Sequence, residues 1–314
     1  MDYPEYPAAR VPQELNFSRI IYTKERGVAT VTINRADVLN ATDFHTLKEM
    51  SRAFEDASYD DSVGVLVLTG VGDRAFCTGA DLKEQEQFLT KRADYWKWMG
   101  AFIEAHDRLR NIGKPTIARL NGMVVGGGNE FNISCDLAIA ADHVTIRQVG
   151  AARGSVPAGG ATQWLPIIIG DRRAREMLLL CEPVTAQKAF EWGLVNAVVP
   201  RAELDAAVAE MADKLLNKMP EIVRYAKQQL NFWRDFSWSL TVGHARDWLS
   251  VHADADETAE GLAAFYEKRD VDYAGLRQRM SQGSSRCHNC GAIVPARAGF
   301  CAECGTKVEA GENA

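Results

Sequence analysis

The sequence predicts an α/β fold, because short apolar runs alternate with segments of helical periodicity. Residues 28–33 and 63–68 are rich in valine, isoleucine and leucine, which is typical of strands, and residues 43–57 between them carry apolar side chains at helical spacing. The same alternation continues with a helix at 95–111, a strand at 116–120, a helix after the glycine run 126–128 and a strand at 136–140. This order predicts a layered core in which helices cover a sheet.

The C-terminal third has a different pattern. From about residue 185 to 273 it is mainly helical, with amphipathic segments at 203–218 and 221–233, so we expect these helices to cap one side of the core. Residues 278–285 are polar and lack a periodic apolar face, which predicts a flexible linker. We therefore divide the chain into a main domain at 15–274, a linker at 275–286 and a small module at 287–308.

Composition limits the partners that the protein can have. The 314 residues are 46% hydrophobic and 25% charged, which is ordinary for a globular protein, and the formal net charge is −6. This charge argues against binding to nucleic acid, since phosphate contacts need a clustered excess of lysine and arginine. The first five residues lack a basic start and an apolar core, and no later apolar run approaches the roughly 18 residues of a membrane span. We expect a cytoplasmic protein without nucleic-acid or membrane partners.

Four of the seven cysteines form a pattern near the C-terminus. Cys287 and Cys290 make one CxxC pair, and after ten intervening residues Cys301 and Cys304 make a second one. Four thiolates at two such turns form a tetrahedral site, so the tail resembles a zinc ribbon with a structural Zn²⁺. About eighteen residues cannot bury a core without the metal. We interpret the ribbon as a docking or assembly module for a protein partner. A disulfide pairing is the alternative, which a reducing compartment disfavours.

Two glycine-bearing turns and one carboxylate indicate chemistry at a polarised carbonyl. Gly126, Gly127 and Gly128 precede a helical segment, so bare backbone N–H groups and the positive end of a helix dipole can face a ligand oxygen. The segment 76–81 contains a second such turn, which can supply another N–H group. Glu130 follows Gly127 by three residues and can deliver or remove a proton beside the carbonyl. This pattern is typical of enzymes that act on acyl thioesters.

Several segments, in order along the chain, resemble the crotonase (enoyl-CoA hydratase/isomerase) superfamily. They are residues 34–41, 75–81, 121–130, 135–137, 189–196 and 264–269, and the resemblance covers about residues 15–273. It implies a ββα superhelical spiral with a helical C-terminal region that forms trimers, often paired as a dimer of trimers, and an acyl-CoA substrate. It places the two oxyanion donors at the N–H groups of Ala80 and Gly127. The coenzyme A contacts that it implies are Thr78, Ala80, Leu82 and Lys83 at the adenine, with Lys268 or Arg269 at the phosphates.

The chain departs from the hydratases of this superfamily at one acid. Those enzymes use two glutamates, and here Glu130 occupies the first position while Gly150 occupies the second. A glycine there resembles the branch of naphthoate synthases and ring-opening hydrolases of cyclic β-oxoacyl-CoA thioesters, which usually lack a glutamate at the position of Glu130. Arg147, Gln148, Arg153 and Ser155 are candidates to replace the missing acid.

Three functions therefore stay open at this point. The first is a hydratase or lyase acting on a conjugated enoyl-CoA, including cyclic and aryl ones, with Glu130 as acid and base. The second is a C–C hydrolase that opens a cyclic β-oxoacyl-CoA ring. The third is a non-catalytic CoA-binding scaffold whose ribbon recruits a partner.

Other residues with reactive or aromatic side chains have structural interpretations as well. Glu130 itself is well placed to stabilise the start of a helix, and Asp81 is expected to do so by accepting backbone hydrogen bonds. A row on one helix is expected either to pack against neighbours or to form the wall of an acyl pocket: Tyr95, Trp96, Trp98, Met99 and Phe102. The remaining expectations are structural: reduced, buried thiols at Cys77, Cys135 and Cys181, structural roles for Asp136 and Asp142, and ordinary packed or surface positions for His106 and His244.

Overall fold

The computed structural model describes residues 9–282, 284–295 and 298–308. The predictions made on the first five residues and on Gly283 lie outside this part. None of the helices among the described residues is long and apolar enough to cross a membrane.

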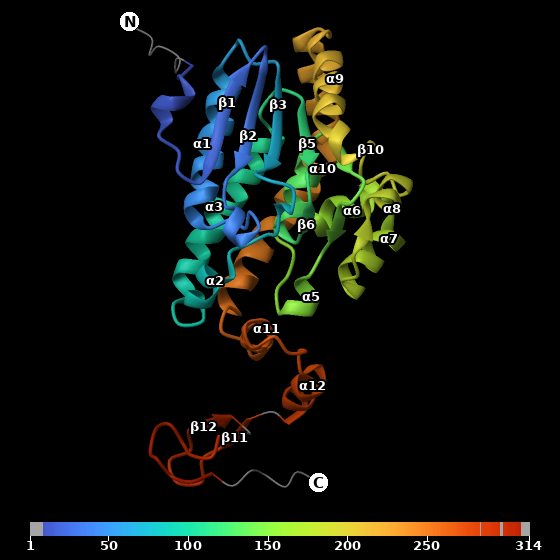
Figure 1. Cartoon of the computed structure of the whole chain (residues 1–314). Helices are drawn as coiled ribbons and strands as arrows, with labels where there is room; N and C mark the ends of the chain where they lie inside the picture. The colour runs from blue at the N-terminus through green and yellow to red at the C-terminus, as the bar shows by residue number, and fades with distance from the viewer. Residues whose placement is uncertain (1–8, 283, 296–297, 309–314) are drawn as a thin grey trace, which may run out of the picture.

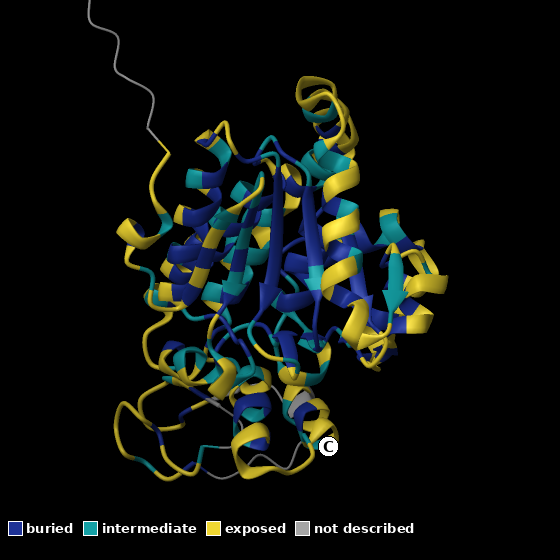
Figure 2. Ribbon diagram, turned by 45° about the horizontal axis from the view of Figure 1, so that its top comes forward, coloured by how far each residue is buried: buried dark blue, intermediate teal, exposed yellow. Residues whose placement is uncertain are grey.

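The core is a six-stranded sheet in the order β1-β2-β3-β5-β7-β10 (Figure 1). Only β1 and β2 pair antiparallel, and the other neighbours are parallel. Every residue of β3 is buried, as expected of a parallel strand covered on both faces, and the central strands are coloured as buried in Figure 2. The bounds are β1 Ile20–Glu25, β2 Val28–Ile33, β3 Val65–Gly70, β5 Thr116–Leu120, β7 Leu137–Ala141 and β10 Ala197–Val199.

A second, smaller sheet has the order β4-β6-β8-β9 and carries the glycine turns. Its strands are short: β4 Ala75–Cys77, β6 Met123–Val125, β8 Thr145–Arg147 and β9 Val184–Thr185. Because β4 and β6 pair in parallel, the turns that follow Cys77 and Val125 leave the sheet at the same edge. This pairing brings two segments forty-odd residues apart in sequence to one place.

The helices pack on the larger sheet and on one another. The helix α3 (Arg92–Arg110) packs between α1 (Phe44–Tyr59) and α10 (Pro220–Val251), and α9 (Leu204–Leu216) lies on β3, β5 and β7. The remaining α-helices are α2 Leu82–Phe88, α4 Gly127–Ser134, α5 Gly150–Arg153, α6 Ala161–Ile169, α7 Asp171–Arg175, α8 Ala186–Glu191, α11 Asp256–Glu267 and α12 Tyr273–Gln282, with a π-helical turn at Glu176–Leu180. The predicted order of strands and helices in the core is confirmed.

Two predicted boundaries differ from the structure. The amphipathic segment at 221–233 is only the first part of α10, which continues to Val251. The irregular backbone expected at 278–285 is wrong for 278–282, because α12 is helical to Gln282, and for 284–285, because these residues belong to strand β11. Asp272 accepts a hydrogen bond from the N–H of Gly275 at 2.8 Å, and Leu276 is buried, so a cap and one apolar anchor hold this polar helix. The division into domains stays a prediction.

The tail is a small unit with its own core. Its two strands, β11 Ser284–Arg286 and β12 Ile293–Pro295, form an antiparallel pair, which Figure 1 shows beyond α12 and apart from the larger sheets. Cys287, Val294, Cys301 and Val308 make a separate buried cluster.

Candidate active site and cysteine cluster

The two predicted glycine turns are in contact. Gly79 and Gly126 have φ of 88° and 55°, which favours glycine. A Cβ on Gly79 would lie 3.1 Å from the amide nitrogen of Gly127, and one on Gly128 would lie 2.0 Å from the carbonyl oxygen of Cys77. Glycine at these positions therefore lets the first turn of α4 rest directly on β4 and on the turn after it.

The amides of Ala80 and Gly127 are free to bind a ligand. Thr42 forms a parallel bridge with Ala80, in which Thr42 donates to the carbonyl of Gly79 at 2.7 Å and Asp81 donates to that of Thr42 at 2.9 Å. This pattern turns the N–H group of Ala80 away from Thr42. Gly127 is the first residue of α4, where an N–H group has no partner within the helix. Neither amide donates a hydrogen bond to any described residue.

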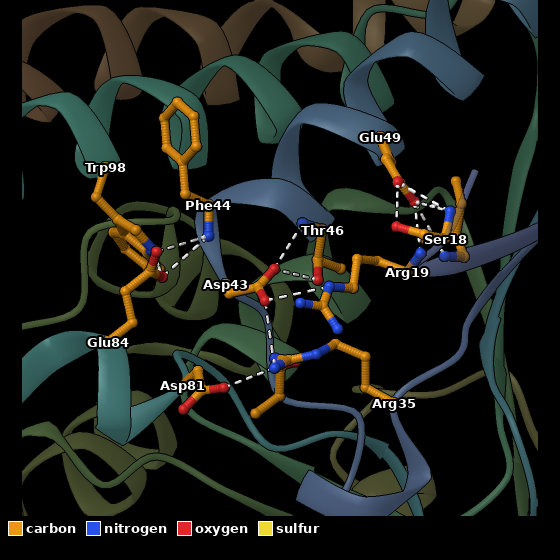
Figure 3. Close-up of polar contacts among 12 residues, drawn as sticks. Ser18, Arg19, Arg35, Asp43, Phe44, Thr46, Glu49, Asp81, Glu84 and Trp98 are labelled. Atoms are coloured by element: carbon orange, nitrogen blue, oxygen red, sulfur yellow. Dashed lines mark hydrogen bonds and ion pairs between the residues drawn. The ribbon is translucent and has the colours of Figure 1, made fainter. Parts of the chain in front are cut away.

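An ion-pair network holds the first turn in place (Figure 3). The guanidinium of Arg35 lies 2.7 Å from Asp81 and 3.2 Å from Asp43, and it donates to the carbonyl of Ala41. Asp81 also accepts from the N–H of Lys83 at 3.0 Å, which confirms its predicted role at the start of α2. The network thus ties the start of α1 and the start of α2 to the turn that carries Ala80.

Glu84 links three helices beside this network. Its carboxylate accepts hydrogen bonds from the N–H of Phe44 at 2.9 Å and from Nε1 of Trp98 at 2.7 Å, as Figure 3 shows. Burial raises the pKa of Glu84. These contacts fix Trp98, a member of the aromatic row, relative to the first turn.

Glu130 is buried one turn into α4. Its Oε1 accepts hydrogen bonds from the N–H groups of Gly159 at 2.7 Å and Ala161 at 3.1 Å. Burial raises the pKa of Glu130 from 4.5 to about 7, although the backbone hydrogen bonds oppose the shift. A carboxyl with this pKa is suited to both accepting and donating a proton near neutral pH.

His106, for which the sequence predicted only an ordinary packed or surface position, lies near Glu130. It is packed, as expected, and its ring stacks on Phe131 with centroids 4.0 Å apart. Its Nδ1 lies 2.7 Å from the carbonyl oxygen of Phe102, whereas its Nε2 has no hydrogen-bond partner among the described residues. The sequence held one signal for this position. Phe102 and His106 are four residues apart on α3, and this spacing places His106 on the same helix face as the aromatic row.

The aromatic row divides between the core and the surface. Tyr95, Trp98, Met99 and Phe102 are buried, and the rings of Trp98 and Phe102 stack at 5.2 Å. A Cβ on Gly127 would lie 3.2 Å from the ring of Phe102, so this ring borders the second turn. Trp96 points outward.

The position of the missing acid is closed to a side chain. A Cβ on Gly150 would lie 2.7 Å from the carbonyl oxygen of Ser155. Of the candidates to replace the acid, Gln148 lies at the second turn and donates to the carbonyl of Gly126 at 3.4 Å. The others have partners elsewhere: Arg147 donates to the carbonyl of Cys181, Arg153 lies over the ring of Phe265, and Ser155 donates to the carbonyl of Val156 at 3.5 Å. Among the described residues, Glu130 on α4 therefore stays the candidate acid beside the second turn.

The predicted coenzyme A residues lie near the first turn. Thr78 donates to the carbonyl of Leu39 at 3.1 Å, Leu82 is half-buried, and Lys83 is exposed at the start of α2. Lys268 is exposed at the end of α11 with φ 54°. The hydroxyl of Tyr266, two residues earlier, lies beside Glu86 of α2, and burial together with nearby carboxylates raises its pKa. The end of α11 is thus next to α2.

One cavity lies away from these turns. It has a volume of about 520 Å³, and its lining includes Gly150, Ser155, Trp248 and Tyr273 but not Ala80, Gly127 or Glu130.

The three scattered cysteines are buried free thiols, as predicted. Burial raises the pKa values of Cys77 and Cys135 to about 12, so neither is a thiolate nucleophile at neutral pH.

The four tail cysteines form one cluster. Their sulfur atoms all lie within 4.8 Å of one another, and the pairs Cys287–Cys304 and Cys290–Cys301 are 3.6 Å apart. These spacings suit the edges of a tetrahedron around Zn²⁺ with bonds of about 2.3 Å, and they are too long for disulfides.

The two CxxC turns have the same backbone. In one, the N–H group of Gly291 donates to the carbonyl of Cys287, and in the other that of Gly305 donates to Cys301, each at 2.9 Å. Both glycines have positive φ, 73° and 70°. The matched turns point four sulfurs at one centre, which fits a metal site.

Comparison with known proteins gives consistent matches. A family model described as enoyl-CoA hydratase/isomerase matches residues 23–277. An enoyl-CoA hydratase structure from Mycobacterium avium subsp. paratuberculosis K-10 is 26% identical, with a TM-score of 0.74, over 82% of this chain and 98% of that one. One from Bacillus anthracis is 30% identical, with a TM-score of 0.67, over 82% and 100%. Pseudomonas aeruginosa DspI is 32% identical, with a TM-score of 0.66, over 81% and 96%. The matches confirm the predicted crotonase-like α/β fold.

Proposed function

The chain belongs to the enoyl-CoA hydratase/isomerase family, and on that premise we propose that it adds water to a conjugated enoyl-CoA whose acyl group is cyclic or carries an aryl ring. The observation that carries most weight is the position of Glu130. This carboxyl is buried, its pKa is raised to about 7, and it lies on the helix whose first amide is free.

The proposed reaction uses one carboxyl for two proton transfers. The thioester oxygen accepts hydrogen bonds from the N–H groups of Ala80 and Gly127. Ionised Glu130 removes a proton from water, the water oxygen bonds to the β-carbon, and the electron pair of the double bond moves through the carbonyl to form an enolate. Glu130 then gives the same proton to the α-carbon, so one water is added in total. Each oxyanion donor is typically worth ~10²–10³ in rate, because it acts where charge develops.

The aromatic row supports a flat or ring-shaped acyl group. The ring of Phe102 borders Gly127, and the stacked ring of Trp98 continues the same surface along α3. An acyl group held at the two amides would meet the edge of the Phe102 ring, which packs well against the face of another ring.

Isotope labelling tests this proposal. A panel of linear, aryl and cyclic enoyl-CoA and oxoacyl-CoA thioesters is incubated in H₂¹⁸O, and mass and label position are recorded. We expect a gain of one water with the label in a new secondary hydroxyl. Glu130→Gln should lower turnover at least roughly a hundredfold, the low end for a general acid–base group, while CoA-ester affinity stays near that of the wild type. Glu25→Gln, at an exposed site on β1, is the control. Full activity of Glu130→Gln would remove the assignment.

A ring-opening C–C hydrolase is the second candidate. The carbonyl of Ser155 closes the position of Gly150 to a carboxylate, so this chain lacks the second acid of the two-glutamate hydratases. Such a hydrolase would place the ¹⁸O label in a new carboxylate with the ring opened. Tight binding of CoA esters with no turnover of any thioester would instead favour the non-catalytic scaffold.

The CoA moiety is proposed to lie along Thr78, Ala80, Leu82 and Lys83, with Lys268 near its phosphates. Support comes from the exposure of both lysines and from the position of the α11 end beside α2. Lys83→Ala and Lys268→Ala should raise KM for the CoA ester and leave kcat within about twofold, since uniform binding is lost.

The ribbon is proposed to hold a structural Zn²⁺ through Cys287, Cys290, Cys301 and Cys304 and to dock a protein partner. With four thiolate ligands there is no open position for catalysis, and the metal would supply stability to a unit whose core is only a few residues.

A homotrimer, or a dimer of trimers, is proposed from the surface of α10. Eight large apolar side chains on this helix are 55–78% exposed, which is typical of an interaction surface. They are Ile222, Tyr225, Leu230, Phe232, Trp233, Phe236, Leu240 and Val251. Light scattering should give the mass of three or six chains, and Trp233→Glu should lower it; a monomeric wild type would overturn the proposal.

A further inference from the structure

His106 and Glu130 both border Gly159. His106 comes from α3, Glu130 from α4, and Gly159 from the segment before α6. A Cβ on Gly159 would lie 2.7 Å from Nε2 of His106 and 2.9 Å from Oε2 of Glu130. The absence of a side chain at Gly159 therefore leaves a space that both the imidazole and the carboxyl border, in which the two groups can approach each other.

The proton of the His106 ring can be assigned to Nδ1. A carbonyl oxygen only accepts hydrogen bonds, so Nδ1 must donate its proton to the carbonyl of Phe102, 2.7 Å away. Nε2 then carries a lone pair and is an acceptor. Burial, together with the positive charge of Arg110, lowers the pKa of His106 to about 3, so the ring stays neutral at physiological pH.

A buried acceptor without a partner is unfavourable. Leaving such a group unsatisfied typically costs about 1–3 kcal/mol. No described residue donates to Nε2. The ring of Phe131 stacks on the imidazole at 4.0 Å, and the ring of Phe102 lies tilted against it at 4.2 Å. A donor for Nε2 can come from a water molecule, from a ligand or from a neighbouring group that changes its protonation state.

Glu130 can be such a donor when its carboxyl is protonated. Its Oε1 accepts hydrogen bonds from the N–H groups of Gly159 and Ala161, and its Oε2, like Nε2 of His106, lies close to the position that a Cβ on Gly159 would take. An ionised carboxylate has no proton to donate, so the two acceptors share no hydrogen bond. A protonated carboxyl has one O–H group, which can donate one hydrogen bond to an acceptor such as Nε2 of His106.

We propose that His106 is the positioning residue for the acid form of Glu130, whose protonated Oε2 donates a hydrogen bond to Nε2 of the neutral imidazole. The inference rests on the proposed use of Glu130 as both base and acid. The proton taken from water stays on Oε2, held toward His106, until it passes to the α-carbon, and His106 itself gains and loses no proton. This hydrogen bond gives a single carboxyl a defined resting place for the proton.

The surroundings keep the histidine neutral over the working pH range. Among the described residues, the charged groups that face this pair are few. From α3, Arg110 lies one turn beyond His106 and is paired with Asp107 at 2.8 Å and with Asp235 of α10 at 2.7 Å. From α4 the ring meets Phe131, and the segment 158–161 presents backbone amides. Glu130 is thus the group whose titration His106 senses.

Infrared titration of the carboxyl tests the proposal without substrate. The C=O band of protonated Glu130 is assigned by its loss in Glu130→Gln, and its midpoint is measured in wild type, His106→Phe and His106→Gln. A hydrogen bond to the protonated form raises a carboxyl pKa. We expect the midpoint to fall by about one pH unit in His106→Phe, a tenfold change in proton affinity of the size one hydrogen bond gives. His106→Gln should keep the wild-type midpoint, because its side-chain oxygen can accept near the position of Nε2. His45→Phe, at an exposed site on α1, is the control.

An unchanged midpoint in His106→Phe, or an equal fall in His106→Gln, overturns the proposal. If His106→Phe does not fold, ¹⁵N spectra of the wild type decide instead, since only six histidines contribute. The Nε2 resonance should shift as Glu130 takes its proton while Nδ1 stays protonated, and a resonance that does not move refutes the pairing. Neither measurement needs turnover, so failure of the proposed reaction in the labelling panel is a separate result.

Discussion

Replacing Glu130 with glutamine should make the protein more stable above neutral pH while it removes activity. The carboxylate is buried, and burial raises its pKa from 4.5 to about 7 in the native state. Between these pH values the native carboxyl keeps a proton that the unfolded chain has lost. The free energy of unfolding therefore falls as the pH rises through this window, because the unfolded state binds fewer protons.

The magnitude follows from the rise in pKa. At 1.36 kcal/mol for each pH unit, the ionised carboxylate destabilises the native state by about 3 kcal/mol above pH 7 and by nothing below pH 4.5. Glutamine carries no charge, and its Oε1 can accept the same hydrogen bonds from Gly159 and Ala161. Its amide group can also donate to Nε2 of His106. Glu130→Gln should thus match the wild type near pH 4.5 and exceed it by up to about 3 kcal/mol at about pH 8.5.

The assay is thermal unfolding of both proteins at the two pH values. Protein concentration is held constant, because assembly contributes to the melting temperature. A difference of 1 kcal/mol shifts the melting temperature by about 2–4 °C in larger domains, so a gap of several degrees should open at high pH. Glu25→Gln, on the surface of β1, should show no such gap. The reasoning is refuted if the gap is the same at both pH values or closes as the pH rises.

Three further changes test the site and the tail. Gly128→Ala would put a Cβ 2.0 Å from the carbonyl oxygen of Cys77; we expect a loss of about 1–3 kcal/mol in denaturant unfolding and a lower kcat/KM, and unchanged values would contradict the close packing. Arg35→Met removes the guanidinium that lies 2.7 Å from Asp81. It should lower the free energy of unfolding by roughly 3–5 kcal/mol, and Arg35→Lys should recover part of this loss. Equal stability of the wild type and both variants would show that the ion pair is not needed. A chelator should release one Zn²⁺ per chain in a colorimetric assay and leave the melting temperature of the main domain unchanged. Cys304→Ser should bind less metal. If the protein is purified without metal and takes up no added Zn²⁺, the zinc assignment is wrong.

Local patterns explain why so much of the fold was predictable. The strand expected at 28–33 is β2, and the one expected at 63–68 is β3 displaced by two residues. Apolar runs of this kind have one stable arrangement in a covered parallel sheet. The prediction was poorer where polar helices depend on a few contacts, as in α12, where one cap and one buried leucine outweigh a polar composition.

The sequence by itself determined which chemical groups the protein has. The glycine turns, Glu130 after the second of them and the two CxxC pairs are encoded within a few consecutive residues, because positive φ, helix starts and metal-ligand spacing are local properties. Only the tertiary structure decided how these groups behave. The parallel pairing of β4 and β6 brings the turns together, burial raises the pKa of Glu130, and α3 carries His106 to its side. Proximity and loss of solvent depend on segments far apart in the chain, so no local pattern could specify them.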